Sequence, residues 1–369
     1  MGRVTLQTVA DAVGVSRMTV SNAFSRPDQL SADLRDRILS TASDLGYVGP
    51  DPAARALARG STGVVGVLFT TELRIAFSDD VAAAFLGAIV DGLAPSGLSP
   101  ALLTTGEAGG RIPTRDVPMD ATLVFSCAPG GPELDWLVRR ALPLVFVDQQ
   151  PAPGIPSVNV DDRGGARVAA EHLIALRHRR IGIVTMGGAP PFGLEDGDAA
   201  ALGVYVTDQR MLGWREALRS AGIEPVVVRQ PKVPYQPQEY GRAALGVLLD
   251  ADPEITAVLC FADSLAHGVL LAAQDRGLAV PDDLSVIGFD DNALAPSLGL
   301  TTVHQDVDEK GRLAAAALVA ATTRKSGTGA GPSGDDDELH IVLPTRLVVR
   351  ASTAAPRTSR PARGWSAGR

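Results

Sequence analysis

Four side chains near the amino end of the chain carry the chemistry of nucleic-acid recognition: Arg17, Met18, Ser21 and Asn22. Arg and Asn have forked hydrogen-bonding groups that can bind base edges in the major groove, and Met can contact a thymine methyl group. A Ser hydroxyl can bind phosphate. These side chains can act together only if one helix presents them on its exposed face.

The surrounding residues predict two short helices joined by a tight turn. Thr5 can cap the first helix, and Gly14 ends it. The second helix begins after Ser16, whose hydroxyl can accept a hydrogen bond from a free backbone N–H group. The first helix would bury a face with i, i+3, i+4, i+7 spacing, made of Leu6, Val9, Ala10 and Val13.

The second helix is expected to bury Val20, Ala23 and Phe24, with Val15 and Val20 forming a hydrophobic staple at its start. A plain helical hairpin with a polar outer face is the alternative. A third amphipathic helix capped by Ser31 weakens that alternative, because it supplies the core that two short helices lack. Its apolar face would consist of Leu34, Ile38, Ala42 and Leu45.

Gly46-Tyr47 and the segment PDPAARALARG, from Pro50 to Gly60, follow the third helix. With the helix-turn-helix, these motifs resemble the LacI/GalR family of bacterial transcription regulators, and the resemblance extends from Val4 to about Arg350. It implies an all-α helix-turn-helix headpiece followed by an α/β effector domain of two lobes, similar to periplasmic sugar-binding proteins.

The resemblance also implies which residues contact double-stranded DNA. Arg17, Met18 and Asn22 are expected to set the base preference, whereas hydroxyl side chains hold phosphate. The expected DNA-binding set is Thr5, Ser16, Arg17, Met18, Thr19, Ser21, Asn22, Ala53 and Leu57.

Residues 50–62 are expected to form a hinge. The stretch from Ala53 to Ala58 has high helix propensity, and a flexible linker is the alternative. In the family this segment is a helix that orders when two copies pair in the minor groove. Leu57 matches the leucine that wedges between the central base pairs and kinks the duplex.

From Gly63 the pattern changes to short apolar strands separated by helical stretches such as 81–93 and 165–176, which is typical of doubly wound parallel sheets. The strands expected in the first lobe are 63–69, 101–105, 122–126 and 143–148. Those expected in the second lobe are 181–185, 225–229, 256–261 and 284–289, and a final strand is expected over 340–350.

The predicted domains are a headpiece over 1–49, the hinge over 50–62, an effector and dimerisation domain over 63–350, and a disordered tail over 351–369. Lobe 1 is expected to contain about 63–160 and 291–322, and lobe 2 about 161–290 and 339–350. The chain would then cross between the lobes three times. A solvated insertion is expected over 326–338.

Ligands of such sheets bind outside the carboxyl ends of the strands. Asp148 follows the fourth expected strand, and Asp161-Asp162 follow the first crossover. With the family matches, the expected effector-binding set is Phe77, Asp79, Asp161, Arg210, Asp263, Asp290 and Gln305. Carboxylates, an amide and an arginine around an aromatic ring suit a polyol such as a sugar. Ala262-Asp263 departs from the Asn-Asp of many family members.

The segment from Met186 to Asp208 is longer than in most family members, and we expect it to overhang the cleft. A Gly-rich phosphate loop is the alternative. The segment lacks a Walker lysine and the strand-GxGxxG-helix context that this alternative requires.

A length of 369 residues suggests two or three domains. No apolar run reaches membrane-spanning length and no secretory segment is visible, so we expect a cytoplasmic protein without a membrane partner. Cys127 and Cys260 are expected to be buried free thiols, with no metal or cofactor. Residues 1–60 hold seven Arg and six Asp in a chain of net charge −8, which is compatible with DNA binding without indicating it.

Three classes of function fit parts of this pattern. A homodimeric, ligand-responsive transcription regulator, expected to be a repressor of a near-palindromic operator, explains the headpiece, hinge and lobes together. A solute-binding protein would need a signal peptide and no helix-turn-helix. An enzyme is not expected, because no catalytic triad, paired carboxylates or nucleotide fingerprint is visible. Within the regulator class, a nucleobase corepressor or a phosphoprotein partner could replace a sugar.

Overall fold

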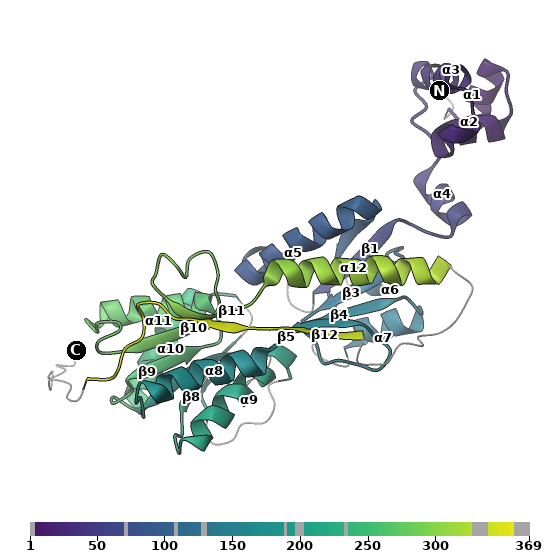
Figure 1. The fold of residues 1–369 in the computed structure, drawn as a ribbon. Coiled ribbons are helices and arrows are strands. Elements are labelled where there is room, and N and C mark those ends of the chain that lie inside the picture. Colours follow the sequence, from purple (N-terminus) through teal and green to yellow (C-terminus); the bar gives the residue numbers. More distant parts are fainter. Residues whose placement is uncertain are drawn as a thin grey trace. The chain divides into compact units, whose positions relative to one another are not determined.

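The computed structural model describes residues 4–69, 73–106, 110–126, 131–187, 190–195, 203–231, 235–326 and 339–357. The chain forms two compact units, Met1–Gly63 and Val64–Arg369 (Figure 1). Each unit has a hydrophobic core of its own.

The first unit contains three packed helices: α1 (Leu6–Val13), α2 (Arg17–Ser25) and α3 (Ala32–Asp44), with a 3-10 turn at Pro27–Gln29. Its core consists of Val9, Ala10, Val20, Ala23, Ile38 and Ala42. The three expected helices and most of their inward residues are confirmed. Leu45 differs, because it ends α3 and is 37% exposed.

Hydroxyl side chains cap the first two helices as expected. Thr5 and Thr8 form a reciprocal capping box, and Ser16 Oγ accepts a hydrogen bond from the Thr19 backbone N–H at 3.0 Å. Gly14 ends α1 with a φ of 77°, a left-handed conformation in which a side chain would be strained. Ser31 stands at the start of α3, but its side chain makes no cap hydrogen bond.

Helix α4 (Pro52–Arg59) occupies most of the expected hinge. The Asp51 carboxylate accepts hydrogen bonds from Ala53 N at 2.8 Å and Ala54 N at 3.3 Å, and proline stands in the first turn, where no intrahelical donor is needed. Gly60 ends the helix with a φ of 68°. The segment is helical here rather than an extended linker.

The second unit holds two sheets. The first has the order β12-β5-β4-β3-β1-β2, with parallel pairing throughout the described strands. Its strands are β1 (Val64–Phe69), β2 (Ser99–Leu103), β3 (Ala121–Phe125), β4 (Leu144–Val147), β5 (Ser157–Val160) and β12 (His340–Leu343). Helices α5 (Asp80–Leu93) and α12 (Val307–Ser326) lie side by side on one face, which is packed through Phe85 and Leu318 (Figure 1).

The opposite face of the first sheet packs against α7 (Pro132–Arg139) through the buried Leu137. Alternate residues of β1 therefore enter different cores: Leu68 contacts the α7 side, whereas Val67 and Phe69 contact the α5 and α12 side. The remaining helical segments of this lobe are η2 (Ile75–Phe77), η3 (Ala94–Ser96) and α6 (Pro113–Asp116).

The second sheet has the order β13-β11-β10-β9-β6-β8-β7. Its strands are β6 (Ile181–Gly187), β7 (Gly193–Leu194), β8 (Val226–Pro231), β9 (Ala257–Cys260), β10 (Ser285–Asp290), β11 (Thr301–His304) and β13 (Arg346–Val348). The two edge strands, β7 and β13, are antiparallel to their neighbours. Helices α8 (Asp162–Ala175) and α9 (Tyr205–Ser220) cover one face, and α10 (Pro237–Ala251) and α11 (Asp263–Asp275) cover the other.

All eight strands expected before residue 290 are present, with ends shifted by at most two residues. The expected division of the lobes, however, is wrong in two places. Residues 291–304 include β11, which pairs with β10 in the second sheet, and 340–343 form β12, which pairs with β5 in the first. Pro344 and Thr345 separate β12 from β13, so the expected single strand over 340–350 is two strands in different sheets.

The expectation of a disordered tail from residue 351 is also wrong for 351–357. Ser352 is 2% exposed, and its Oγ donates to the Val286 carbonyl at 2.6 Å and accepts from Thr301 N at 2.8 Å. Ala354 O accepts from the Ser285 hydroxyl, and Arg357 pairs with Asp282. This stretch therefore closes the amino ends of β10 and β11.

Two further expectations lie outside the described residues: Cys127, and positions 327–338 of the expected insertion. Cys260 is a buried free thiol, as expected, and burial raises its pKa above the ordinary range. Residues 358–369 of the expected tail are likewise outside the described ranges.

We predict that Ser352→Ala lowers the free energy of unfolding of the second unit by about 1 to 3 kcal/mol, because it removes the hydroxyl that bonds the Thr301 N–H and the Val286 carbonyl in a buried place. Ser297→Ala is the matched control, since Ser297 is exposed and donates a single bond to the Leu294 carbonyl. It should change stability by less than about 0.5 kcal/mol. Urea unfolding measures both, and equal effects would contradict an ordered tail.

Candidate functional site

Part of the expected DNA-binding face of helix α2 is exposed to solvent. Arg17 is exposed and Met18 is 69% exposed, while Ser21 and Asn22 are half-buried. The Asn22 amide donates one N–H to Gln29 Oε1 at 3.2 Å, so this side chain is partly engaged within the headpiece. Arg17 and Met18 are therefore the recognition side chains most directly available to a major groove.

The expected phosphate-binding hydroxyls lie at the start of the same helix. Ser16 and Thr19 hydroxyls hydrogen bond to each other at 2.8 Å, which leaves each oxygen with further bonding capacity. Thr5 is exposed at the start of α1. On α4, Ala53 is exposed and Leu57 is 86% exposed, so both side chains are accessible to another molecule.

A second candidate site is a cavity of about 110 Å³ at the carboxyl ends of strands from both sheets. This is where ligands bind in doubly wound sheets. Its described lining consists of Phe69, Ile75, Ala76, Asp79, Val81, Ala82, Phe125, Ser126, Asp148, Met186, Gly187, Val204, Val206, Thr207, Arg210, Tyr235, Phe261, Ala262, Asp290 and Gln305.

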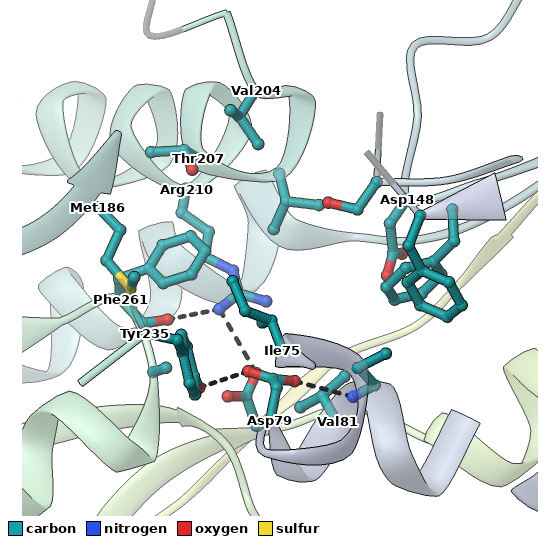
Figure 2. Close-up of a pocket in the computed structure, with 18 of the residues that line it drawn as sticks. Ile75, Asp79, Val81, Asp148, Met186, Val204, Thr207, Arg210, Tyr235 and Phe261 are labelled. Carbon is teal, nitrogen blue, oxygen red and sulfur yellow. Dashed lines mark hydrogen bonds and ion pairs between the residues drawn. The ribbon is translucent and has the colours of Figure 1, made fainter. Parts of the chain in front are cut away.

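Four of the seven expected effector residues line this cavity: Asp79, Arg210, Asp290 and Gln305. They come from the start of α5, from α9, from the end of β10 and from the crossover after β11. Figure 2 shows Asp79 and Arg210 on one side of the cavity and Asp148 on the other.

The other three expected effector residues do not line the cavity, and each has a different role. Phe77 is 64% exposed at the end of η2. Asp161 is exposed and caps α8 by accepting from Gly164 N at 2.8 Å. Asp263 is 1% exposed and accepts from the Thr302 hydroxyl and from Asn292 N, so it supports the β10–β11 region. The structure therefore does not bring these three residues to the cavity.

Arg210 is the centre of the polar side of the cavity and is 3% exposed. Its Nε donates to Asp162 Oδ1 at 2.8 Å, and its Nη1 donates to the Phe261 carbonyl at 2.5 Å and to Asp290 Oδ1 at 3.4 Å. The guanidinium carbon lies 3.5 Å from the centre of the Phe289 ring and 4.6 Å from that of Phe261. Stacking and pairing together hold the group in one orientation.

Close packing of α8 and α9 brings Arg210 to Asp162. Gly213, less than one turn after Arg210, faces the Arg163 carbonyl so closely that a Cβ atom there would lie 2.1 Å from that oxygen. Trp214, 1% exposed, fills the adjacent core. A larger residue at 213 would push the helices apart and separate the ion pair.

Burial and charge compete at this ion pair. Burial raises the pKa of Asp162 to about 6 and raises that of Asp290 well above its usual range, while Arg210 opposes both shifts. For Arg210, burial lowers the pKa, but the Asp162 and Asp290 carboxylates outweigh it and the net shift is upward. The guanidinium therefore stays charged.

The polar network continues from Asp290 into the first lobe. Gln305 Nε2 donates to Asp290 Oδ1 at 2.7 Å, and Lys310 Nζ donates to Gln305 Oε1 at 3.0 Å and to Asp148 Oδ2 at 2.7 Å. Asp290 has a φ of 115°, a backbone conformation that few non-glycine residues adopt, and these bonds help to hold it there.

Two further bonds join the lobes at the start of α5. The Tyr235 hydroxyl donates to Asp79 Oδ2 at 2.5 Å, and Asn292 Nδ2 donates to Asp80 Oδ2 at 2.9 Å (Figure 2 shows the first). Burial, followed by the Asp79 charge, raises the pKa of Tyr235 above its ordinary range, so this hydroxyl remains a donor.

Several residues of this site are absent from the set expected from the sequence. Asp148 is one of them, although its position directly after β4 was a signal that could have found it. Tyr235 and Lys310 carried no such signal, because each meets its partner only through the fold. The long segment after Met186 does border the cavity at both ends, through Gly187 and Val204; its residues 188–189 and 196–202 are outside the described ranges.

The described residues meet the requirements of neither a metal site nor a membrane-spanning helix. They contain no group of three or more His, Cys, Asp and Glu side chains that could hold a metal ion. Nor does any helix within them combine the length and apolarity needed to cross a membrane.

Two family models match the chain. Residues 5–49 match the model of bacterial regulatory proteins of the lacI family, and residues 170–353 match a periplasmic binding protein-like domain. An HTH-type transcriptional regulator of Mycolicibacterium smegmatis is 37% identical, over 96% of this chain and 97% of that protein. The chain belongs to the LacI family. It is therefore a DNA-binding transcriptional regulator.

Solved structures of LacI-family regulators have the same architecture. The transcriptional regulator CelR, solved in complex with cellobiose, is 27% identical with a TM-score of 0.65, over 95% of this chain and all of that one. The lac repressor dimer, solved bound to operator, has a TM-score of 0.73 at 23% identity, over 96% of this chain and all of that one. The second likeness establishes the fold of a headpiece followed by two α/β lobes.

For the headpiece, we predict that Arg17→Ala relaxes base preference at one position of each half-site and costs about 1 to 3 kcal/mol of specific binding free energy. Arg35→Ala, at an exposed position of α3, serves as the matched control. Binding of a selected operator and of its single-base variants measures the effect. An equal loss of affinity for random DNA would make Arg17 a phosphate contact instead.

Proposed function

We propose that this LacI-family regulator is a homodimeric repressor whose affinity for a near-palindromic operator is controlled by a sugar or related polyol bound in the cavity between the lobes. The observation that carries the proposal is the cavity itself. It combines the carboxylates of Asp79, Asp148 and Asp290 and the amide of Gln305 with apolar and aromatic walls.

This combination matches the chemistry of a polyol. Carboxylate and amide groups bind paired hydroxyls, and aromatic rings pack against the C–H face of a sugar. Phe69, Phe125 and Phe261 supply such rings around the cavity. The cellobiose complex of the related CelR gives independent support for a sugar as the class of effector.

The lobe-to-lobe bonds give the ligand a way to act at a distance. A molecule that binds Arg210 and Asp290 of lobe 2 together with Asp79 of lobe 1 must favour one arrangement of the lobes over another. It can shift that equilibrium only by its difference in affinity for the two arrangements. By linkage, the operator must change effector affinity by the same factor as the effector changes operator affinity.

Dimerisation follows from the small size of the headpiece. One recognition helix covers only a few base pairs, and a two-fold symmetric protein matches a two-fold symmetric site. Pairing also doubles the number of phosphates that a weakly basic headpiece neutralises. We predict that footprinting on the operator protects two half-sites related by a dyad. A protected site without dyad symmetry would contradict the dimer.

The effector is tested by a thermal-shift screen of the whole protein with ribose, galactose, cellobiose, adenine and guanine. We expect a polyol to raise the unfolding temperature, because a ligand that binds only the folded state stabilises it. If only adenine or guanine stabilises the protein, the effector is a nucleobase corepressor and not a sugar.

We predict that Arg210→Ala abolishes the effector response while operator binding remains, since the headpiece is a separate compact unit with its own core. Coupling of this kind is typically about 1 to 3 kcal/mol, and the variant should reduce it to near zero. Operator affinity with and without the stabilising polyol is the measurement. Arg167→Ala, which removes an exposed arginine of α8, is the control and should respond like the wild type.

Loss of a buried cation leaves Asp162 and Asp290 without their partner and can destabilise the lobe. Asp290→Asn, which keeps the size of the side chain, therefore accompanies Arg210→Ala and should also weaken the response. If a folded Arg210→Ala variant still responds fully, the effector does not bind in this cavity. A variant that loses operator binding without ligand would make Arg210 structural.

A further inference from the structure

Lys310 is a fully buried lysine close to the effector cavity. It lies near the start of α12, has no exposed surface, and donates from Nζ to Asp148 Oδ2 at 2.7 Å and to Gln305 Oε1 at 3.0 Å. The chain has only three lysines, at 232, 310 and 325, among 34 basic residues. A buried ammonium group is costly unless it is paired and hydrogen-bonded, so its bonds to Asp148 and Gln305 are essential to the site.

The ammonium group determines which way the Gln305 amide faces. Because lysine can only donate, the amide oxygen must face Nζ, and the amide N–H groups must then face Asp290. Gln305 Nε2 donates to Asp290 Oδ1 at 2.7 Å, as this requires. The side chains of Asp148, Lys310, Gln305 and Asp290 thus form a chain of hydrogen bonds. Lys310 donates to both of its neighbours in this chain, and Gln305 donates to Asp290.

Lys310 also orients the Asp148 carboxylate. Oδ2 accepts from the ammonium, whereas Oδ1 is buried and has no hydrogen-bond partner among the described residues. Asp148 lines the cavity, and its backbone is held at a φ of 51°. A buried carboxylate oxygen without a partner is unfavourable, so a hydroxyl group or a water molecule in the cavity would be its donor.

The charges around the cavity favour an uncharged ligand. Among the described lining residues Arg210 is the one cation, and the Asp162 and Asp290 carboxylates already engage it. Lys310 is likewise neutralised by Asp148. Among the described residues, a phosphate group would therefore face Asp79, Asp148 and Asp290 without a free cation to pair with.

We infer that Lys310 is a positioning residue for the effector: its ammonium orients the Asp148 carboxylate and the Gln305 amide, so that the cavity binds an uncharged ligand rich in hydroxyl groups and rejects the phosphate ester of that ligand. The inference rests on the proposed function, because it concerns the same cavity. Arginine would not be a conservative substitution for Lys310, because its planar guanidinium group is larger than an ammonium group and forms hydrogen bonds with a different geometry.

The first test needs no ligand. In protein labelled with ¹⁵N-lysine, a buried and hydrogen-bonded ammonium exchanges its protons slowly and gives a resolved ¹H–¹⁵N signal. We expect a signal that Lys310→Met removes and that Asp148→Asn shifts. Arg312→Met, which removes an exposed cation from the same helix, should leave the signal in place. Absence of a protected signal from Lys310 would overturn the inference, whatever the effector is.

The second test separates positioning from simple charge neutralisation. Lys310→Met leaves Asp148 unpaired and can fail to fold, so the comparison uses Asp148→Asn and the double variant Lys310→Met/Asp148→Asn. We expect Asp148→Asn to unfold at a lower temperature than the double variant, because it leaves the Lys310 ammonium buried without its carboxylate; both affinities are therefore measured below the lower transition. We also expect the double variant to bind galactose or ribose at least fivefold more weakly than Asp148→Asn, because the Gln305 amide oxygen has lost its donor and the amide is held only by its bond to Asp290. Equal affinities would show that Lys310 does not position the ligand.

The third test addresses the ligand class. Titration calorimetry compares galactose with galactose 1-phosphate and ribose with ribose 5-phosphate on the wild-type protein. We expect the neutral member of a pair to bind at least tenfold more tightly. Tighter binding of a phosphate would overturn the inference while leaving a sugar-type effector in place. If no neutral polyol binds although the Lys310 signal is protected, the sugar effector of the proposed function fails instead.

Discussion

The two lobes depend on one physical constraint, which is that a charged guanidinium withdrawn from water must be neutralised where it lies. Arg210 is 3% exposed, and Asp162 and Asp290 supply the compensating charge. Each of these carboxylates is itself buried, and Asp290 needs the further hydrogen bond from Gln305. Because Gln305 in turn depends on Lys310, removal of any member leaves a buried polar group unpaired.

Parallel sheets explain why this network forms at the cleft. The strands that lead to the cavity end at one edge of each sheet, and both edges line the cavity. Asp148 after β4 of the first sheet therefore meets Asp290 at the end of β10 and Gln305 after β11 of the second, although they are far apart in the sequence. The close approach of α8 and α9 at Gly213 adds Arg210 and Asp162 to the same place. Polar groups therefore converge on the cavity, while the apolar faces of both sheets are covered by helices.

The structure also suggests how the cavity could influence the headpiece. Strand β1 begins at Val64, directly after the first unit ends at Gly63, and its other end, Phe69, lines the cavity. A rigid strand thus leads from the cavity to the segment that carries α4. In the proposed function, a change in the relative pose of the lobes is passed to the hinge along this chain connection.

The sequence by itself determined the elements whose signals are local. Caps, apolar spacing and a glycine stop located α1 and α2, and apolar runs located eight strands to within two residues. Only the tertiary structure decided which sheet each strand joins, so β11 and β12 were placed in the wrong lobes. It also decided where side chains point: Phe77 is exposed, Asp263 is buried, and Lys310 reaches Asp148. Strand pairing and side-chain partners depend on contacts between residues that are distant in the sequence. The residue pattern of a short segment does not specify which surface will pack against it.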